Sequence, residues 1–278
     1  MFGGIIGDYT GSIYEYDHSP KEKEFLLWQE EMMVTDDSIL TVAIAEVLTK
    51  NFPIDYSKEG LEKISKDCEK AFFKYYGDYP MAGYGGKFSQ WIFTKNRKPY
   101  NSWGNGSAMR VSSVGWMANS EEEVKLLSNA VTALTHNHPE GLKGAEATAM
   151  CIYLLRKGKS KEYVKEYVKK HYYPQIDKFD YEKLVMTYYF DPSCQGTVPQ
   201  AIFAFLISNS FEDCLRTAVS IGGDCDTLTC IACSIAEAHY GIPFGFLQQI
   251  KRAIPRDLTD VILKFEKLIK ERDNPLKK

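Results

Sequence analysis

Residues 221–239 read IGGDCDTLTCIACSIAEAH, a glycine pair and two carboxylates followed by a nearly continuous apolar run. The run from Leu228 to His239 is too apolar for the protein surface and predicts a buried helix. Asp226 or Thr227 is expected at its N-terminal cap, where a side-chain oxygen satisfies a free N–H group. Asp224 and Asp226 are therefore held at the mouth of a core helix, which indicates a metal-binding loop.

A second acidic helix start lies far upstream, where Thr35, Asp36, Asp37 and Ser38 precede the apolar run Ile39–Leu48. Capping and the helix dipole favour such residues, so either start alone has a structural explanation. One side chain caps a helix, however, and the two starts together carry four carboxylates that would repel one another without cations between them. Oxygen ligands of this kind favour Mg²⁺, Mn²⁺ or Ca²⁺ over zinc.

The composition excludes several classes of protein. The chain has 278 residues with a formal net charge of −3, which provides no electrostatic basis for general nucleic-acid binding. No linker rich in proline, glycine or serine divides it, so we expect one domain over residues 1–278. Several of the seven cysteines lie inside apolar helical patterns, which indicates a reducing compartment, and no apolar run is long enough to span a bilayer. We therefore expect a cytoplasmic protein without membrane contact.

Helical periodicity accounts for most of the chain, and no alternating strand pattern competes with it. Two capping boxes, Ser120 with Glu123 and Ser210 with Asp213, mark helix starts. The predicted helices cover residues 3–14, 39–48, 57–76, 121–134, 144–156, 161–171, 180–189, 198–207, 210–221, 228–239 and 257–272. The sequence therefore predicts a compact all-α domain.

Gly3, Gly7 and Gly11 recur every four residues, so the first helix would have one bare face, which ends at Glu15. Close packing against another helix and contact with a ligand explain this stripe equally well, since both need an uncovered backbone. Asp8, one position off the stripe, is expected to hydrogen-bond neighbouring loops. Residues 17–31 are polar and charged and predict a surface loop or flap that could gate a site.

Two glycine-rich loops, residues 81–86 and 100–110, can bring bare backbone N–H groups to an anion such as a phosphate. Neither matches a Walker or dinucleotide-binding pattern, and ordinary turns have the same composition. His136 and His138 stand two residues apart in a predicted turn, with no cysteine or third histidine beside them. Hydrogen bonding within the loop, or to a polar ligand, is therefore a better interpretation than metal binding.

Five of these segments, in this order and spacing, resemble the ADP-ribosylglycohydrolase family over nearly the whole chain. They are GDYTGSIYE at residues 7–15, TDDS at 35–38, GNGSAMRV at 104–111, LTHNHPEG at 134–141 and GGDCDT at 222–227. Two positions depart from the family pattern, since Ser38 replaces a threonine and Cys225 replaces a threonine or serine. Neither position is a ligand in the family, so the departures leave the expected metal site intact.

The resemblance implies an orthogonal bundle of α-helices with a dinuclear site at helix N-termini that holds two Mg²⁺ ions, with Mn²⁺ as an alternative. The implied metal ligands are Thr35, Asp36, Asp37, Asp224, Asp226 and Thr227. Glu15 matches a flap glutamate near the scissile bond, and Glu15, Asp36 and Asp37 are the expected catalytic groups. The expected substrate-binding residues are Gly83, Ser102, Trp103, Gly104, Asn105 and His136, which would surround the diphosphate and riboses.

The sequence thus predicts a metal-dependent hydrolase of the glycosidic bond between ADP-ribose and an acceptor, either a protein side chain or a related group. A non-catalytic ADP-ribose-binding or crystallin-like structural protein of the same fold is the alternative, and the complete acidic set favours catalysis. A dinuclear phosphoesterase would usually recruit histidine ligands, which these motifs lack. The acceptor and the oligomeric state stay open.

Overall fold

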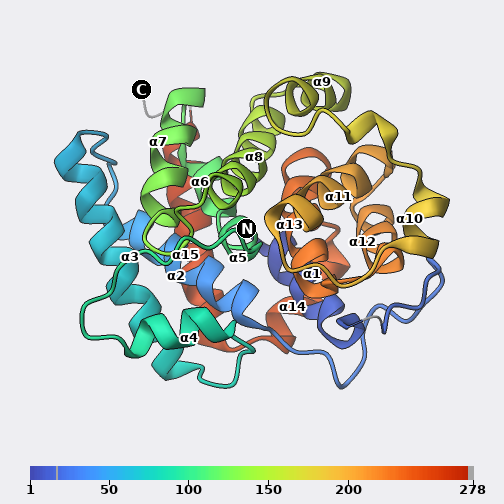
Figure 1. The fold of residues 1–278 in the computed structure, drawn as a ribbon, viewed down its shortest axis with the longest axis horizontal. Helices are drawn as coiled ribbons and strands as arrows, with labels where there is room; N and C mark the ends of the chain where they lie inside the picture. Colours follow the sequence, from blue (N-terminus) through green and yellow to red (C-terminus); the bar gives the residue numbers. More distant parts are fainter. Residues whose placement is uncertain (17, 275–278) are drawn as a thin grey trace.

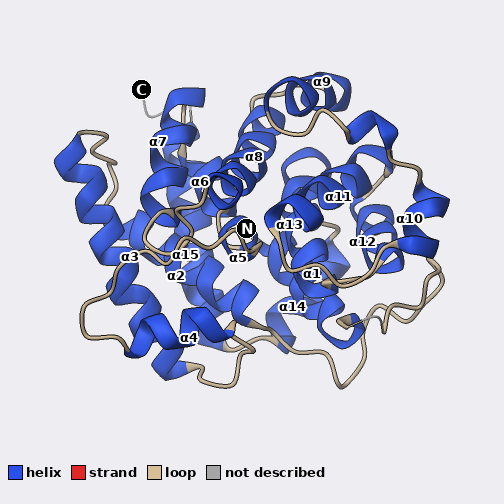
Figure 2. Ribbon diagram, in the orientation of Figure 1, coloured by secondary structure: helices blue, strands red, loops and turns tan. Residues whose placement is uncertain are grey.

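The computed structural model describes residues 1–16 and 18–274, and helices dominate this part of the chain (Figure 1). Within these residues there is no strand (Figure 2), and a single antiparallel bridge joins Gly104 to Ser193. The predicted all-α fold is confirmed.

The described helices follow one another through short and long loops. They are α1 (Phe2–Gly11), α2 (Asp36–Lys50), α3 (Lys58–Asp78), α4 (Gly86–Phe93), α5 (Gly106–Met109), α6 (Ser112–Met117), α7 (Glu121–Thr132), α8 (Pro139–Arg156), α9 (Lys161–His171), α10 (Tyr181–Thr187), α11 (Cys194–Ile207), α12 (Phe211–Ile221), α13 (Cys225–Tyr240), α14 (Phe244–Ala253) and α15 (Arg256–Asp273). Two 3₁₀ turns, Ser12–Tyr14 and Ile176–Lys178, complete the described secondary structure.

Helix α13 is the centre of the fold. Every side chain from Cys225 to Ala236 is buried, which agrees with the apolar run that predicted this helix. α13 packs against α1, α8, α11 and α12, and its most extensive contact is with α1 (Figure 1). The first and the thirteenth helix of the chain therefore lie side by side at the core.

The contact between α1 and α13 depends on the glycine stripe. A Cβ atom on Gly3 would lie 2.5 Å from the carbonyl oxygen of Cys233, and one on Gly7 would lie 2.2 Å from that of Thr229. At Gly11 the Thr229 hydroxyl would be only 2.3 Å away. Close helix packing, one of the two explanations offered by the sequence, is thus the role of the stripe.

We expect Gly7→Ala to lower the free energy of unfolding by about 1–3 kcal/mol, because the added methyl group overpacks a helix contact made by backbone atoms. Gly77→Ala in α3 is the matched control, since a Cβ atom there meets nothing within 4 Å. That change should be neutral or stabilise by up to about 1 kcal/mol. Urea unfolding of both variants checks this, and equal stability of Gly7→Ala and wild type would contradict the packing role.

Serine caps begin several helices as predicted. The Ser120 hydroxyl accepts a hydrogen bond from the Glu123 amide at 3.1 Å, and the Ser210 hydroxyl accepts one from the Asp213 amide at 3.0 Å. Ser57 caps α3 in the same way. These side chains satisfy N–H groups that have no partner inside the helix.

Three predicted helix starts are wrong. The N-cap residue of α13 is Asp224, whose side chain makes no capping hydrogen bond, so Asp226 and Thr227 lie inside the first turn of the helix. α8 begins at Pro139 and not at residue 144, because proline fits the first helical position and the His138 ring accepts a hydrogen bond from the Glu140 amide. α11 begins at Cys194 and not at residue 198, so Pro199 lies inside the helix.

Helices α4, α5, α6 and α14 were not predicted. The first three follow glycine-rich segments and are short, so their apolar periodicity is too brief to be recognised. α3 extends beyond its predicted end at residue 76 and continues through Gly77 to Asp78. Among the described residues, none of the helices has the length and apolar character that a bilayer crossing requires.

Candidate active site

A cavity of about 550 Å³ opens where α2 and α13 begin. It is lined by every residue that the sequence proposed for the site, although they come from widely separated segments. These residues are Glu15, Thr35, Asp36, Asp37, Gly83, Ser102, Trp103, Gly104, Asn105, His136, Asp224, Asp226 and Thr227. The hydroxyl of Thr227 reaches the Asp37 carboxylate at 3.3 Å, so the two acidic helix starts meet in space as expected.

The carboxylates form two groups that share one member. Asp8, Asp37 and Asp226 each place an oxygen within 4.8 Å of the others, and so do Glu15, Asp224 and Asp226. Asp226 therefore stands between the two groups. Asp36 lines the cavity but belongs to neither group.

Asp8 holds the start of α2 in place. Its fully buried carboxylate accepts hydrogen bonds from the Thr35 amide at 2.9 Å, the Thr35 hydroxyl at 2.7 Å and the Ser38 amide at 3.0 Å. The Ser38 hydroxyl donates a further hydrogen bond to it. The expected role of Asp8 in hydrogen bonding is thus confirmed, whereas its place in a carboxylate group was not foreseen.

Asp224 is oriented from a different part of the chain. The side-chain amide of Asn105 donates to the Asp224 carboxylate at 2.8 Å and to the Thr197 hydroxyl at 3.0 Å. Both amide hydrogens of Asn105 are therefore used within the protein. This arrangement ties the glycine loop before α5 to the first turn of α13.

Burial and mutual repulsion raise the pKa values of the whole cluster. Burial first, and then the nearby Asp226 charge, raises the pKa of Asp8 to about 7, and the same two causes raise the pKa of Glu15 to about 7. For the same reasons the pKa values of Asp36, Asp37 and Asp224 lie well above the usual range. Burial is also the main cause of the raised pKa of Asp226.

The residues present fit a hard divalent cation. The Oδ1 atom of Asp37 is buried and has no hydrogen-bond partner among the described residues, an arrangement that a bound cation would satisfy. All the convergent ligand atoms are carboxylate or hydroxyl oxygens, the donors preferred by Mg²⁺, Mn²⁺ and Ca²⁺. A cation would also relieve the repulsion that raises the pKa values.

In the metal-free chain we expect stability to fall as pH rises. The pKa values of Asp8 and Glu15 are about 7 in the folded chain and about 4 when unfolded, so the folded state binds more protons between these values. The melting temperature of chelator-treated protein should therefore decrease from about pH 5 to about pH 8. A divalent cation should recover most stability at the upper end.

Differential scanning calorimetry with a chelator, and then with added MgCl₂, measures this. Glu15→Gln removes one of the groups whose pKa is raised and should make the pH dependence less steep. A melting temperature of the chelated protein that is constant or increases across the same range would contradict the repulsive cluster.

The remaining wall of the cavity is built by the glycine loops, the segment around Pro192, and His136. Gly104 donates its amide hydrogen to the Ser102 hydroxyl at 3.1 Å, and Asn105 donates its own to the Pro192 carbonyl at 2.9 Å. These two amides are thus engaged within the protein. His136 is almost fully buried, and its ring lies beside Gly104 and Gly106.

Trp103 forms an exposed part of the cavity wall. Its ring is 46% exposed and packs edge-on against His138, with ring centroids 5.5 Å apart. The Lys87 ammonium lies 5.5 Å from the Trp103 ring centroid and also lines the cavity. Gly83, at the rim, has a φ of +88°, a conformation that favours glycine.

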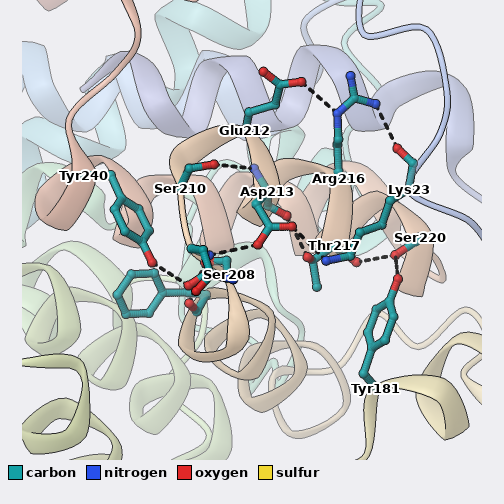
Figure 3. A network of polar contacts seen from close by, with 12 residues as sticks. Lys23, Tyr181, Ser208, Ser210, Glu212, Asp213, Arg216, Thr217, Ser220 and Tyr240 are labelled. Carbon is teal, nitrogen blue, oxygen red and sulfur yellow. Dashed lines mark hydrogen bonds and ion pairs between the residues drawn. The ribbon is translucent and has the colours of Figure 1, made fainter.

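The segment between Glu15 and Thr35 is a loop in its described residues, as predicted, and it is firmly attached to α12 (Figure 3). The Arg216 guanidinium donates to the carbonyl oxygen of Lys23 at 2.8 Å. It also donates to the carbonyl oxygen of Phe25 at 3.0 Å. The Lys23 ammonium pairs with Asp213 at 2.8 Å. Position 17, the first residue of the expected flap, lies outside the described residues.

Three side chains of the cavity were missed by sequence reasoning. Tyr16 stacks on Phe190 with ring centroids 4.9 Å apart, beside Glu15. Arg110 is buried below the glycine loop. The aromatic pair has no local sequence signal because its members are far apart in the chain, whereas Arg110 stood inside a motif that had been quoted without a role for it.

Comparison with known proteins agrees with this geometry. A model of the family ADP-ribosylglycohydrolase matches residues 1–275. The chain is 24% identical to ADP-ribosylhydrolase ARH3 of Mus musculus, covering 87% of this chain and 83% of that protein. It is 26% identical to the ADP-ribosyl-(dinitrogen reductase) glycohydrolase of Rhodospirillum rubrum, covering 56% of this chain and 53% of that protein.

The fold is also similar to a solved structure of an ADP-ribosylglycohydrolase-related protein complex. The TM-score is 0.70 at 21% sequence identity, covering 96% of this chain and 95% of that chain. The fold is that of the ADP-ribosylglycohydrolases, and the acidic clusters of the cavity could hold a metal ion. The chain belongs to the ADP-ribosylglycohydrolase family, which confirms the resemblance seen in its motifs and the expected hydrolysis of ADP-ribose linkages.

Proposed function

We propose that the chain uses two bound Mg²⁺ or Mn²⁺ ions to cleave the glycosidic bond between ADP-ribose and an acceptor, which is a protein side chain or a related group. The observation that supports this most is the position of Asp226 in two carboxylate groups that face one cavity. Two groups with a common carboxylate suit two neighbouring cations, with Asp226 as the bridging ligand.

The proposed ligands are the oxygen-bearing residues at the two helix starts: Thr35, Asp36, Asp37, Asp224, Asp226 and Thr227. Asp8 is proposed to position Thr35 and not to bind a cation, because its oxygens already accept four hydrogen bonds. When bound, the cations would neutralise the carboxylates and act as Lewis acids toward the hydroxyls of the distal ribose.

Glu15 is the proposed proton carrier at the leaving group. It is half-buried at the cavity and has a pKa of about 7 in the metal-free chain, and a carboxyl group in such an environment can hold or release a proton near neutral pH. Asp36 or Asp37 is proposed to accept a proton from the attacking water. These two proton-transfer roles match glycoside hydrolysis in general, where two carboxyl groups flank the bond that breaks.

The substrate-binding assignments follow from the other end of the cavity. Gly83, Ser102, Trp103, Gly104, Asn105 and His136 line it and are proposed to surround the ADP-ribose. Trp103 offers an exposed aromatic face to a ring. Asn105 is proposed to contribute through Asp224, since its amide hydrogens are already used.

We expect Glu15→Gln to reduce turnover by roughly 100-fold or more, the usual effect of losing an acid–base group. Binding of ADP-ribose and of cations should change little, because the amide keeps the shape of the side chain. Steady-state hydrolysis and calorimetric titration measure the two effects separately. Glu30→Gln, an exposed glutamate of the same loop, is the control and should have full activity. Wild-type turnover by Glu15→Gln would exclude its catalytic role.

We expect Asp226→Asn to abolish cation-dependent thermal stabilisation, because both carboxylate groups lose their shared member. The matched control is Asp191→Asn, which changes a carboxylate of the same cavity that belongs to neither group. Its Oδ1 atom still accepts the hydrogen bond from the Ser193 amide after the change. Titration of each variant with MnCl₂ measures the difference, and equal binding by both would place the cations elsewhere.

A non-catalytic ADP-ribose-binding or structural protein is the alternative function. Incubation of the chain with serine-, arginine- and nucleic-acid-linked ADP-ribose distinguishes the two and also identifies the acceptor. Release of ADP-ribose from one linkage supports catalysis. Binding without release from any of them would support the alternative.

A further inference from the structure

Arg110 is the last residue of the second glycine-rich segment, and its buried guanidinium has an unusual environment. Arg110 is 1% exposed, and within the described residues no carboxylate forms an ion pair with it. Its charge lies 4.6 Å from the ring centroid of Phe72 and 5.8 Å from that of Phe88. The one hydrogen bond found for its terminal nitrogens runs from Nη2 to the Thr135 hydroxyl, at 2.7 Å.

This hydrogen bond determines what the Thr135 hydroxyl can do. A guanidinium only donates, so the hydroxyl must accept from Arg110 and has its single proton left for another partner. Three possible partners are near: His136 Nδ1 at 2.8 Å, the Thr132 carbonyl oxygen at 3.4 Å, and the side chain of Tyr100, which also hydrogen-bonds with Thr135. The Tyr100 hydroxyl carries a proton of its own, and of the other two partners the shorter distance favours donation to His136 Nδ1.

Acceptance at Nδ1 fixes the protonation of the imidazole. Burial first, and then the Arg110 charge, lowers the pKa of His136 well below its usual value, so the ring is neutral near pH 7. A neutral imidazole has one N–H, and since Nδ1 accepts, the hydrogen is on Nε2.

Nε2 faces the cavity. A Cβ atom on Gly104 would lie 3.6 Å from it, and one on Gly106 would lie 3.3 Å from it. No protein hydrogen bond to Nε2 occurs among the described residues, whereas the amides of Gly104 and Asn105 are engaged with Ser102 and Pro192. The ring is therefore a free donor at a place where two neighbouring donors are already used.

We propose that Arg110 and Thr135 act as positioning residues that hold His136 as the Nε2–H tautomer, so that His136 donates a hydrogen bond to an oxygen of the bound ADP-ribose. The ligand half of this inference, which is the hydrogen bond from His136 to ADP-ribose, rests on the proposed function. The other tautomer would direct a lone pair at that oxygen and repel it. Arg110 acts through Thr135 and does not need to touch the ligand.

The test begins with nuclear magnetic resonance of the ligand-free full chain labelled with ¹⁵N-histidine, near pH 7, with His136 assigned by its loss in His136→Gln. We expect one Nε2–H tautomer in wild type and in Thr135→Ser. Thr135→Val keeps the side-chain volume but lacks the hydroxyl, so the single tautomer should be lost. An Nδ1–H or doubly protonated His136 in wild type, or an unchanged tautomer in Thr135→Val, would overturn the inference.

Calorimetric titration with ADP-ribose tests the ligand half. Thr135→Ser should bind about as tightly as wild type, and Thr135→Val should bind roughly 10-fold more weakly or worse, the usual effect of losing a hydrogen bond to a charged group. Equal affinity in all three proteins would overturn the assignment of His136 as a donor. Arg110→Met should also lose the single tautomer of His136. If this variant does not fold, the comparison of Thr135→Ser with Thr135→Val is sufficient to test the inference.

The tautomer of His136 and its hydrogen bond to ADP-ribose are tested by different outcomes. A wild type that has the expected tautomer but does not bind ADP-ribose would overturn the proposed ligand and the ligand half of the inference together. In that case the tautomer would still follow from Arg110 and Thr135. A wild type that binds ADP-ribose with the wrong tautomer would overturn the inference alone.

Discussion

The close contact between α1 and α13 is the constraint on which the rest of the structure depends. With no side chains between the helices at Gly3, Gly7 and Gly11, their backbones approach to within hydrogen-bonding distance. The Thr229 hydroxyl of α13 lies 2.7 Å from the Gly7 carbonyl oxygen. This approach brings Asp8 of α1 and Glu15, just after it, to the first turn of α13, where Asp226 lies. A wider separation of the helices would remove both carboxylates from the groups that Asp226 joins.

The second constraint is electrostatic. The carboxylates are buried close together, and their raised pKa values express the free energy that this arrangement costs in the absence of cations. Neutral hydrogen-bond donors offset part of that cost, notably Thr35 and Ser38 at Asp8 and Asn105 at Asp224. These donors come from loops and helix starts, so the segments that form the cavity also position its charges.

Sequence reasoning predicted the longer helices and the residues of the cavity well, because both leave local signals. Serine caps and apolar periodicity mark the helices, and short motifs mark the acidic helix starts and the glycine loops. The short loop from Asp224 to Thr227 already indicated Asp226 as the shared carboxylate. The grouping of Asp226 with Asp8, and the stacking of Tyr16 on Phe190, depend on the three-dimensional path of the chain, so no local pattern could reveal them. The start of α8 was misplaced because His138 and Pro139, which resemble a turn in sequence, cap and begin the helix.

The attachment of the loop after Glu15 has a consequence for how a large substrate reaches the cavity. Arg216 and Asp213 of α12 hold Lys23 and Phe25, so the middle of this loop cannot swing away without breaking several polar contacts. Tyr16, directly after Glu15, has a ring that is 62% exposed and rests on Phe190. A substrate that enters the cavity therefore meets a wall whose loop is held by α12 and which presents an exposed aromatic ring beside Glu15.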